Sequence, residues 1–266
     1  MTCLRSFNIR FAIAMLVLMA LAGCGDSNIF EGVGDKNSKQ AQTEQALIAM
    51  DDGDYQTAIN ILTTLVQNNP GDAQLLQYLS SAYAGAAGLD TLNILTVINQ
   101  LDSNGQSGNI DMIGLALGNA NGQLSSEEVA AKLANINNAI ATLNLIQNPN
   151  SDQTIQLGVL SMAHFSLSLG ELIMGDLGTD EVTLTEQGIH DQYGGNPADF
   201  SAASPQTLAG IEQDIANMNA AVTSLNAISG ESNDLAQDIL DFQSAIDQGA
   251  DGQITSGDLE HYVDSL

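Results

Sequence analysis

The sequence is poor in aromatic residues. It contains no tryptophan, and aromatic residues make up only 4% of its 266 residues. Its apolar content is therefore mainly leucine, isoleucine and alanine, which suits helix packing better than a sheet rich in valine, tyrosine and phenylalanine. We expect an all-α fold that buries one sizeable core or two smaller ones.

Basic residues are also scarce, with five lysines and arginines against 32 aspartates and glutamates. Such a surface repels nucleic acid and anionic headgroups, so its charge disfavours a phosphate-binding or DNA-binding role. Divalent cations or basic and polar partners are more natural ligands. Adaptation to salty surroundings would produce the same composition, and the sequence does not separate the two explanations.

Common catalytic motifs are missing. The sequence has no Walker loop, no dinucleotide-binding glycine motif, no Gly-x-Ser-x-Gly elbow and no His-Glu-x-x-His. We therefore predict that the protein is not an enzyme.

The N-terminus has the three-part layout of a secretory signal. Arg5 and Arg10 come first, an apolar run follows from residue 11 to 22, and the segment ends in Leu21-Ala22-Gly23-Cys24. The run is shorter than the roughly 20 residues that a membrane-spanning helix needs. The segment resembles a bacterial lipoprotein signal, or lipobox. That resemblance implies a signal peptide over 1–23, cleavage before Cys24, and covalent diacylglycerol and fatty acid on Cys24.

Lipidation would make Cys24 a membrane anchor, because several acyl chains hold a protein permanently. Cys3, the other cysteine, lies in the signal, so no disulfide would remain. A secreted protein with a chance cysteine is the alternative. Gly25 follows Cys24 where an inner-membrane lipoprotein would have aspartate, which favours the outer membrane of the cell envelope. The sequence does not indicate whether the protein faces the periplasm or the exterior. After cleavage the net charge would be −29, with Lys36, Lys39 and Lys132 as the basic residues.

Residues 24–40, rich in glycine and small polar residues, are expected to form a flexible tether to a helical domain over 41–266. Within 41–90, apolar residues recur at helical spacing. The stretch Gly53-Asp54-Tyr55-Gln56-Thr57-Ala58-Ile59, followed by Leu62, Leu65 and Pro70, resembles the second helix and terminal turn of a tetratricopeptide repeat. Glycine permits the tight turn, Tyr55 would pack on the preceding helix, and Pro70 would end the hairpin. The resemblance implies helical hairpins in an irregular α-solenoid or bundle.

The rest of the domain is also predicted to be helical, because apolar periodicity and flanking glycines and prolines recur along it. Further helices are expected over 73–84, 91–101, 110–117, 127–145, 155–172, 207–228, 233–246 and 259–266. Between residues 175 and 205 the pattern breaks. We expect an irregular insert there, either functional or a disordered loop.

The C-terminal segment 247–258 resembles a 12-residue EF-hand calcium loop. The resemblance implies calcium ligands at Asp247, Asp251, Gln253, Thr255 and Asp258. Gly249 has no side chain to provide one of the expected ligands, and Asp258 replaces the usual glutamate. The affinity for calcium should therefore be weak. An Asp-Gly turn that binds no ion is the alternative.

A possible partner loop places Asn119, Asn121, Ser125 and Glu128 at ligand positions, but its first position holds Leu117. We therefore favour a vestigial hand, or a helix cap through Ser125, Ser126 and Glu128, over a metal site.

These observations favour a membrane-anchored, non-enzymatic module that docks an envelope protein or peptide, with calcium as a stabilising ion. The alternative is a periplasmic carrier with a ligand cavity lined by Met162, His164 and Phe165. An enzyme acting through His190, with Asp191 and Tyr193, is a third hypothesis. His164 itself is expected to be a core or groove residue, and His261 a surface residue.

Overall fold

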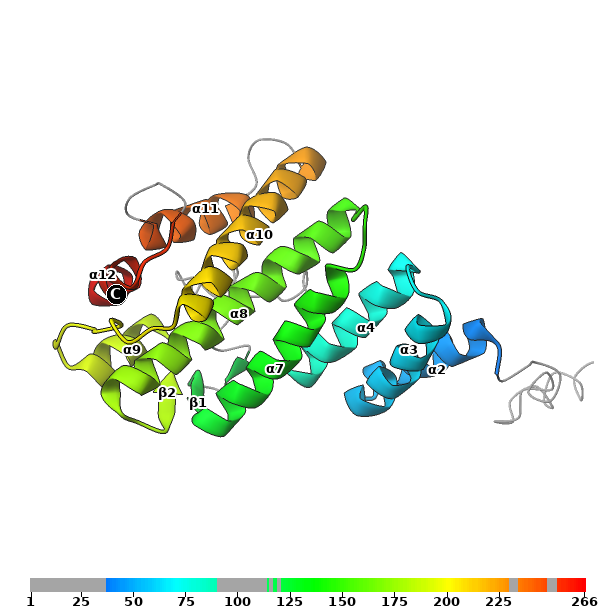
Figure 1. Ribbon diagram of the computed structural model, residues 1–266, viewed down its shortest axis with the longest axis horizontal. Coiled ribbons are helices and arrows are strands. Elements are labelled where there is room, and N and C mark those ends of the chain that lie inside the picture. Colours follow the sequence, from blue (N-terminus) through cyan, green and yellow to red (C-terminus); the bar gives the residue numbers. More distant parts are fainter. Residues whose placement is uncertain (1–36, 90–113, 115–116, 119–120, 230–233, 248–252) are drawn as a thin grey trace, which may run out of the picture. The chain divides into compact units, whose positions relative to one another are not determined.

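The computed structural model describes residues 37–89, 114, 117–118, 121–229, 234–247 and 253–266. The chain divides into two units, Met1–Ala41 and Gln42–Leu266, and the described part is all-α apart from one very small sheet (Figure 1). The expected all-α class is confirmed. The helices predicted over 91–101 and 110–117 lie outside the described residues, except at 114 and 117. The helices are α2 (Lys39–Asp51), α3 (Tyr55–Asn68), α4 (Ala73–Ala86), α7 (Ser126–Leu143), α8 (Ser151–Leu177), α9 (Glu186–Tyr193), α10 (Pro205–Ser229), α11 (Asp234–Ile246) and α12 (Ser256–Ser265).

Tight turns and aspartate caps set the ends of the first helices. The Asp54 carboxylate accepts the Thr57 amide at 3.2 Å and caps α3. Asp72 caps α4 in the same way, because its carboxylate accepts the amides of Gln74 and Leu75. The preceding glycines, Gly53 and Gly71, have φ of 76° and 89°, a conformation that side chains disfavour. The predicted turns after residues 52 and 70 are therefore present.

Helices α2, α3 and α4 share a small apolar core. It consists of alanines and aliphatic side chains, among them Ala58 and Leu62, both fully buried. Tyr55 packs beside it against α4, where a methyl group on Gly85 would overlap the Tyr55 ring. The Tyr55 ring thus contacts α4, the helix that follows, and not only the preceding helix as predicted. This arrangement gives helical hairpins, and their assignment to the tetratricopeptide type stays a prediction.

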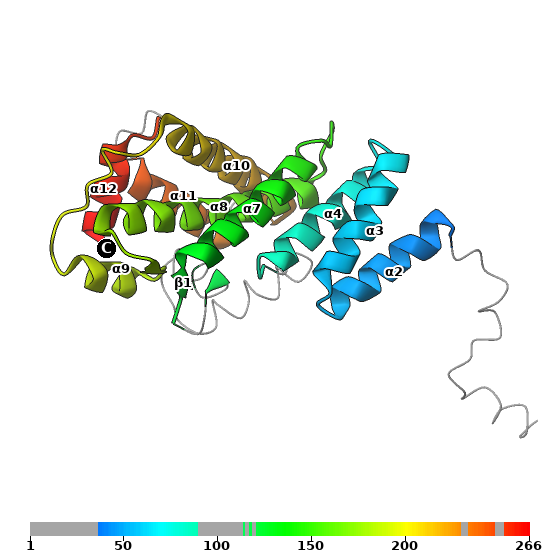
Figure 2. The same ribbon diagram turned by 60° about the horizontal axis from the view of Figure 1, so that its bottom comes forward.

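From α4 onward the long helices pack as antiparallel neighbours (Figure 2). Lys132, near the start of α7, donates from Nζ to the carbonyl oxygen of Ala87, just past the end of α4, at 2.6 Å. Helices α8 and α10 are antiparallel, because residues further along α8 meet residues earlier in α10. Gly158 lies beside Ala221, and Ser161 is bonded to Asn217. Because successive helices reverse direction, their connections lie at two opposite edges of the array.

Helix α8 lies at the centre of the larger core. A capping box between Asn150 and Gln153 begins it, and Gly178 with φ of 63° ends it. Most of its length is buried between α7 and α10, and its fully buried Phe165 packs edge-to-face against Phe242. The centroids of these two rings are 5.1 Å apart. The C-terminal helices are thereby joined to the centre of the domain.

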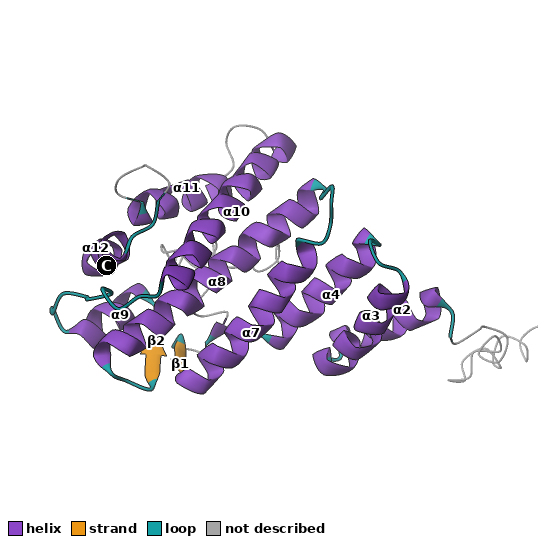
Figure 3. Cartoon of the chain, viewed as in Figure 1, coloured by secondary structure: helices purple, strands orange, loops and turns teal. Residues whose placement is uncertain are grey.

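Two three-residue strands pair across a long sequence separation. Strand β1 (Gln123–Ser125) runs antiparallel to β2 (Glu181–Thr183), with Leu124 opposite Val182 (Figure 3). Both central side chains are buried. The other edge of β2 is bonded by a side chain, because the Thr183 amide donates to Oε1 of Gln192 at 3.0 Å and Nε2 of Gln192 donates to the Glu181 carbonyl at 3.3 Å. Gln192 thus takes the place of a third strand.

The stretch 175–205, predicted to be an irregular insert, contains the end of α8, strand β2, helix α9 and the connection 194–204. The connection is fixed at its centre by Phe200, which is 2% exposed. The order of this stretch therefore comes from burial and sheet pairing rather than from helical periodicity.

Candidate functional site

The described part of the predicted calcium loop forms a helix cap. The Thr255 hydroxyl and amide lie 2.6 Å and 2.9 Å from Oδ2 of Asp258, and the Thr255 hydroxyl accepts the Asp258 amide at 3.3 Å. This capping box begins α12 at Ser256. Ile254 is 3% exposed, as expected for the anchoring position. Asp258 thus has a structural role without an ion.

The other predicted ligands of this loop are only partly among the described residues. Asp247 follows the end of α11, Gln253 is exposed, and Asp251 lies outside the described residues. Among the residues that the structure places, no three His, Cys, Asp or Glu side chains gather in a metal-binding group. Calcium binding by 247–258 therefore stays a prediction that rests on the sequence pattern.

The second predicted loop is built on the same plan. The amide and hydroxyl of Ser125 lie 2.8 Å and 2.7 Å from Oε2 of Glu128, and the Ser125 hydroxyl accepts the Glu128 amide. These hydrogen bonds begin α7, so the predicted cap through Ser125 and Glu128 is confirmed. The backbone hydrogen bond from Ser125 also lowers the pKa of Glu128.

The two capped turns correspond residue by residue. The segment 120–129 reads Ala-Asn-Gly-Gln-Leu-Ser-Ser-Glu-Glu-Val, and 250–259 reads Ala-Asp-Gly-Gln-Ile-Thr-Ser-Gly-Asp-Leu. In both, the apolar fifth residue is buried, the sixth is the N-cap and the ninth closes the capping box. Their neighbours differ, because Leu124 pairs with β2 whereas the Ile254 amide donates to Glu212 of α10 at 3.2 Å.

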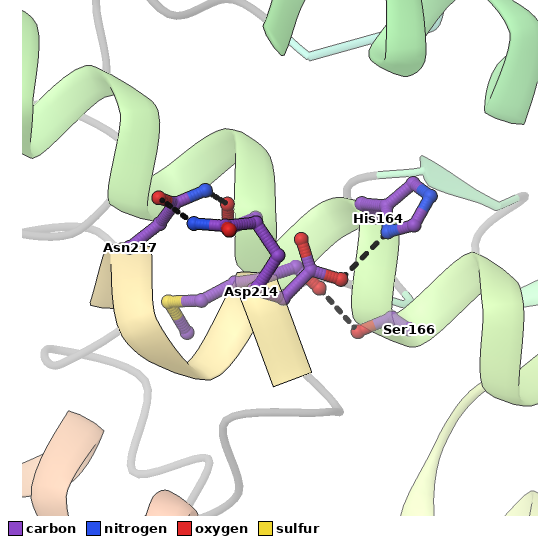
Figure 4. A network of polar contacts seen from close by, with 7 residues as sticks. His164, Ser166, Asp214 and Asn217 are labelled. Carbon is purple, nitrogen blue, oxygen red and sulfur yellow. Dashed lines mark hydrogen bonds and ion pairs between the residues drawn. The ribbon is translucent and has the colours of Figure 1, made fainter. Parts of the chain in front are cut away.

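His164 belongs to a buried polar network between α8 and α10 (Figure 4). Its Nδ1 lies 2.6 Å from Oδ2 of Asp214, and the two side chains are 14% and 3% exposed. One turn away, Asn217 donates to Oγ of Ser161 at 2.9 Å and accepts from Gln213. Gly210, a turn before Asp214 on α10, leaves room for the imidazole ring. The network bonds α8 to α10 in an otherwise apolar interface.

Burial is the main influence on the ionisation of Asp214. Burial raises the pKa of Asp214 to about 6, against the opposing effects of the hydrogen bond and charge of His164 and the hydrogen bond of Ser161. Because Nδ1 of His164 is bonded to Asp214, Nε2 is the ring nitrogen through which a ligand or substrate would have to bind. The neighbouring hydroxyls are already engaged, Ser161 with Asn217 and Ser166 as a donor to the Met162 carbonyl. The contacts therefore indicate a structural pair, in agreement with the expected core or groove position of His164.

The other histidine hypothesis joins two exposed residues, His190 and Asp191, to the buried Tyr193. His190 Nδ1 and Asp191 Oδ1 are 3.7 Å apart, with side chains 61% and 69% exposed. Tyr193 is 5% exposed, and its hydroxyl donates to Asp176 at 3.0 Å. Burial, followed by this hydrogen bond to Asp176, raises the pKa of Tyr193. The three residues do not form one site. His261 is exposed on α12, as predicted.

Carboxylates hold the connection before α10 by its backbone. Amides 198, 199 and 200 donate to Asp264, Asp176 and Glu260, at 2.9, 3.1 and 2.8 Å. Two of these carboxylates come from α12 and one from the end of α8. Sequence analysis missed this arrangement, since each partner pair is far apart in the chain, and Phe200 is its only local signal.

Two further predictions concern membranes and ligands. Cys24 lies outside the described residues. Among the described helices, α8 is long and apolar enough to cross a membrane by length and composition, and most of its apolar window is buried inside the protein.

Met162 and Phe165, which the carrier hypothesis places in the lining of a ligand cavity, pack inside the larger core.

Comparisons with protein-family models, with curated proteins and with solved structures found no match to this chain.

Proposed function

We propose that this chain is a lipid-anchored envelope protein whose helical domain docks a protein or peptide and catalyses no reaction. The observation that carries the proposal is the sequence from Arg5 to Cys24, with its basic start, short apolar run and Leu-Ala-Gly-Cys end. Acyl chains on Cys24 would hold the domain at the outer membrane.

Docking is supported by the helical architecture and by charge. Stacked helical hairpins expose extended surfaces on which peptides and proteins bind. The tetratricopeptide-like pattern of residues 53–70 adds to this argument. Because acidic residues far outnumber basic ones, a basic or polar partner is favoured and nucleic acid is disfavoured.

The anchor is tested by labelling cells with a radioactive fatty acid and isolating the protein. We expect label on the wild type and its loss in Cys24→Ala, together with release of that variant from the membrane fraction. Cys3→Ala is the matched control, because its cysteine lies in the signal, and it should be labelled normally. Equal labelling of Cys24→Ala would contradict the proposal.

Docking is tested with a photo-crosslinking residue at Ile48, whose side chain is 60% exposed on α2. We expect a discrete crosslinked species in intact cells, which added salt should weaken if charge contributes to binding. If neither Ile48 nor other exposed positions on the hairpins give such a species, the docking role is wrong.

Calcium is proposed as a stabilising ion of the C-terminal loop. A ligand that binds only the folded state raises its melting temperature. About 2 mM calcium, suited to weak extracellular sites, should therefore raise the Tm of the mature protein, and excess chelator should reverse this. The Asp247→Ala, Asp251→Ala double variant should not respond. An unchanged wild-type curve would leave the loop as a helix cap alone.

A further inference from the structure

The helical array has two chemically different edges. One edge, here called the acidic edge, includes the α2–α3 turn, the start of α7, the segment between α8 and α10, and α12. The other, here called the tether edge, includes the start of the second unit at Gln42 in α2, the α3–α4 and α7–α8 connections, and the end of α10. The division follows from the antiparallel packing of successive helices.

Carboxylates gather at the acidic edge. The turn after α2 contains Asp51, Asp52 and Asp54, and further acidic residues follow on the other elements of this edge: Glu127, Glu128, Asp176, Asp180, Glu181, Glu186, Asp191, Asp199, Asp258, Glu260 and Asp264. The described connections of the tether edge have only Asp72 and Asp152, with Asp234 at the start of α11. Negative charge is thus concentrated on one side of the unit.

The tether edge has the opposite character. Of the four large apolar side chains that are exposed among the described residues, two are on it, Leu145 after α7 and Ile228 at the end of α10, both 61% exposed. Ile48, 60% exposed, lies instead near the end of α2, one turn before the α2–α3 turn. Exposed apolar side chains favour the interfacial zone of a bilayer.

The helices are long enough for the difference between the two edges to orient the unit at a membrane. The 18 residues of α7 separate the two edges by about 27 Å. That is several times the screening length of about 8 Å in physiological salt. The 15 residues from Cys24 to Lys39 span at most about 50 Å, so the proposed anchor would keep the unit near the membrane. Charge and apolar contact are the forces that would orient it there.

We propose that the tether edge lies on the membrane surface, with Leu145 and Ile228 at the lipid interface, and that the acidic edge points away from the membrane. This inference rests on the proposed lipid anchor. The inverted orientation would bring the acidic edge within a screening length of anionic headgroups, which repel it. Oriented in this way, the anchored protein presents its carboxylates to partners at a distance from the bilayer.

The absence of tryptophan provides a direct test. The full-length lipidated protein is prepared as three single-tryptophan variants, Leu145→Trp, Ile228→Trp and Ala202→Trp. Ala202 is exposed in the connection before α10, at the acidic edge. Each variant is reconstituted on vesicles of phosphatidylcholine and phosphatidylglycerol that contain a lipid with a fluorescence-quenching nitroxide. Circular dichroism confirms that each variant is folded.

We expect quenching of Leu145→Trp and Ile228→Trp to exceed that of Ala202→Trp by roughly threefold or more, because only the tether edge would be within about a screening length of the lipid. Equal quenching at the three positions, stronger quenching of Ala202→Trp, or no quenching would overturn the orientation. Flotation with the vesicles separates the two proposals. A protein that does not float contradicts the lipid anchor itself, whereas a floating protein with equal quenching contradicts only the orientation.

Discussion

Asp214 is a buried carboxylate whose ionisation opposes folding. Its pKa is raised to about 6 by burial, from 3.8. A raised pKa means that the folded state binds the proton more tightly than the unfolded state. The stabilisation from that proton is complete below the unfolded pKa and is lost as the pH rises to about 6. Near neutral pH, the hydrogen bonds of His164 and Ser161 compensate for part of the burial of the charge.

Replacement of Asp214 by asparagine removes this titration. As the pH rises from about 4 to about 7, the wild type should lose stability relative to Asp214→Asn, by on the order of 1 to 3 kcal/mol. Urea denaturation of both proteins at several pH values measures the difference. Asp191→Asn, at a side chain 69% exposed, is the control and should show no such trend. A constant difference between wild type and Asp214→Asn would contradict the argument.

Lys132 is a part-buried lysine that bonds the end of α4. Its Nζ donates to the Ala87 carbonyl, and burial lowers its pKa despite the nearby carboxylate of Glu128. Lys132→Met keeps much of the apolar stem and removes the donor. We expect a loss of about 1 to 3 kcal/mol, typical of a hydrogen bond from a charged group, measured by urea denaturation. Stability equal to the wild type would show that solvent replaces this bond.

At the scale of elements, two glycines in α8 provide a matched pair of substitutions. A methyl group at Gly158 would overlap the Cβ of Ala221 on α10, whereas one at Gly175 would meet no atom within 4 Å. Gly158→Ala should therefore destabilise by about 1 to 3 kcal/mol through overpacking. Gly175→Ala should stabilise by up to about 1 kcal/mol, because alanine is the better helix former. Chemical denaturation of both variants tests this, and equal effects would show that α8 and α10 separate easily.

The local sequence pattern predicted where the helices lie better than it predicted which elements they contact. The helix expected over 155–172 extends from Ser151 to Leu177, because the Asn150–Gln153 capping box and Gly178 set its ends. Strands β1 and β2 were missed, since three residues give no periodic signal. The cap at Ser125 was predictable because its partner Glu128 lies three residues away. The bonds of His164 to Asp214 and of Glu260 to the connection before α10 were not, because each joins residues 50 or more positions apart.

At the scale of the whole molecule, net charge should govern the response to salt. The chain has a net charge of −27, and the carboxylates are concentrated at one edge of the array. Their mutual repulsion destabilises the compact state and weakens as ions screen it. The Tm should therefore rise from about 20 mM to about 500 mM sodium chloride, followed by circular dichroism. Because monovalent ions suffice for screening, potassium chloride should act equally. A falling Tm would indicate that ion pairs outweigh the repulsion.

The side chain of Gln192, bonded along the outer edge of β2, has a consequence for the membrane anchorage that we propose. A membrane restricts its proteins to two dimensions, where neighbouring copies meet far more often than in dilute solution. An open strand edge would then be a template on which one copy could pair with the next. With its amide already bonded to Thr183 and Glu181, Gln192 fills those positions from within the same chain. In the proposed lipid-anchored protein, this edge of β2 would thereby be closed to pairing with a neighbouring copy.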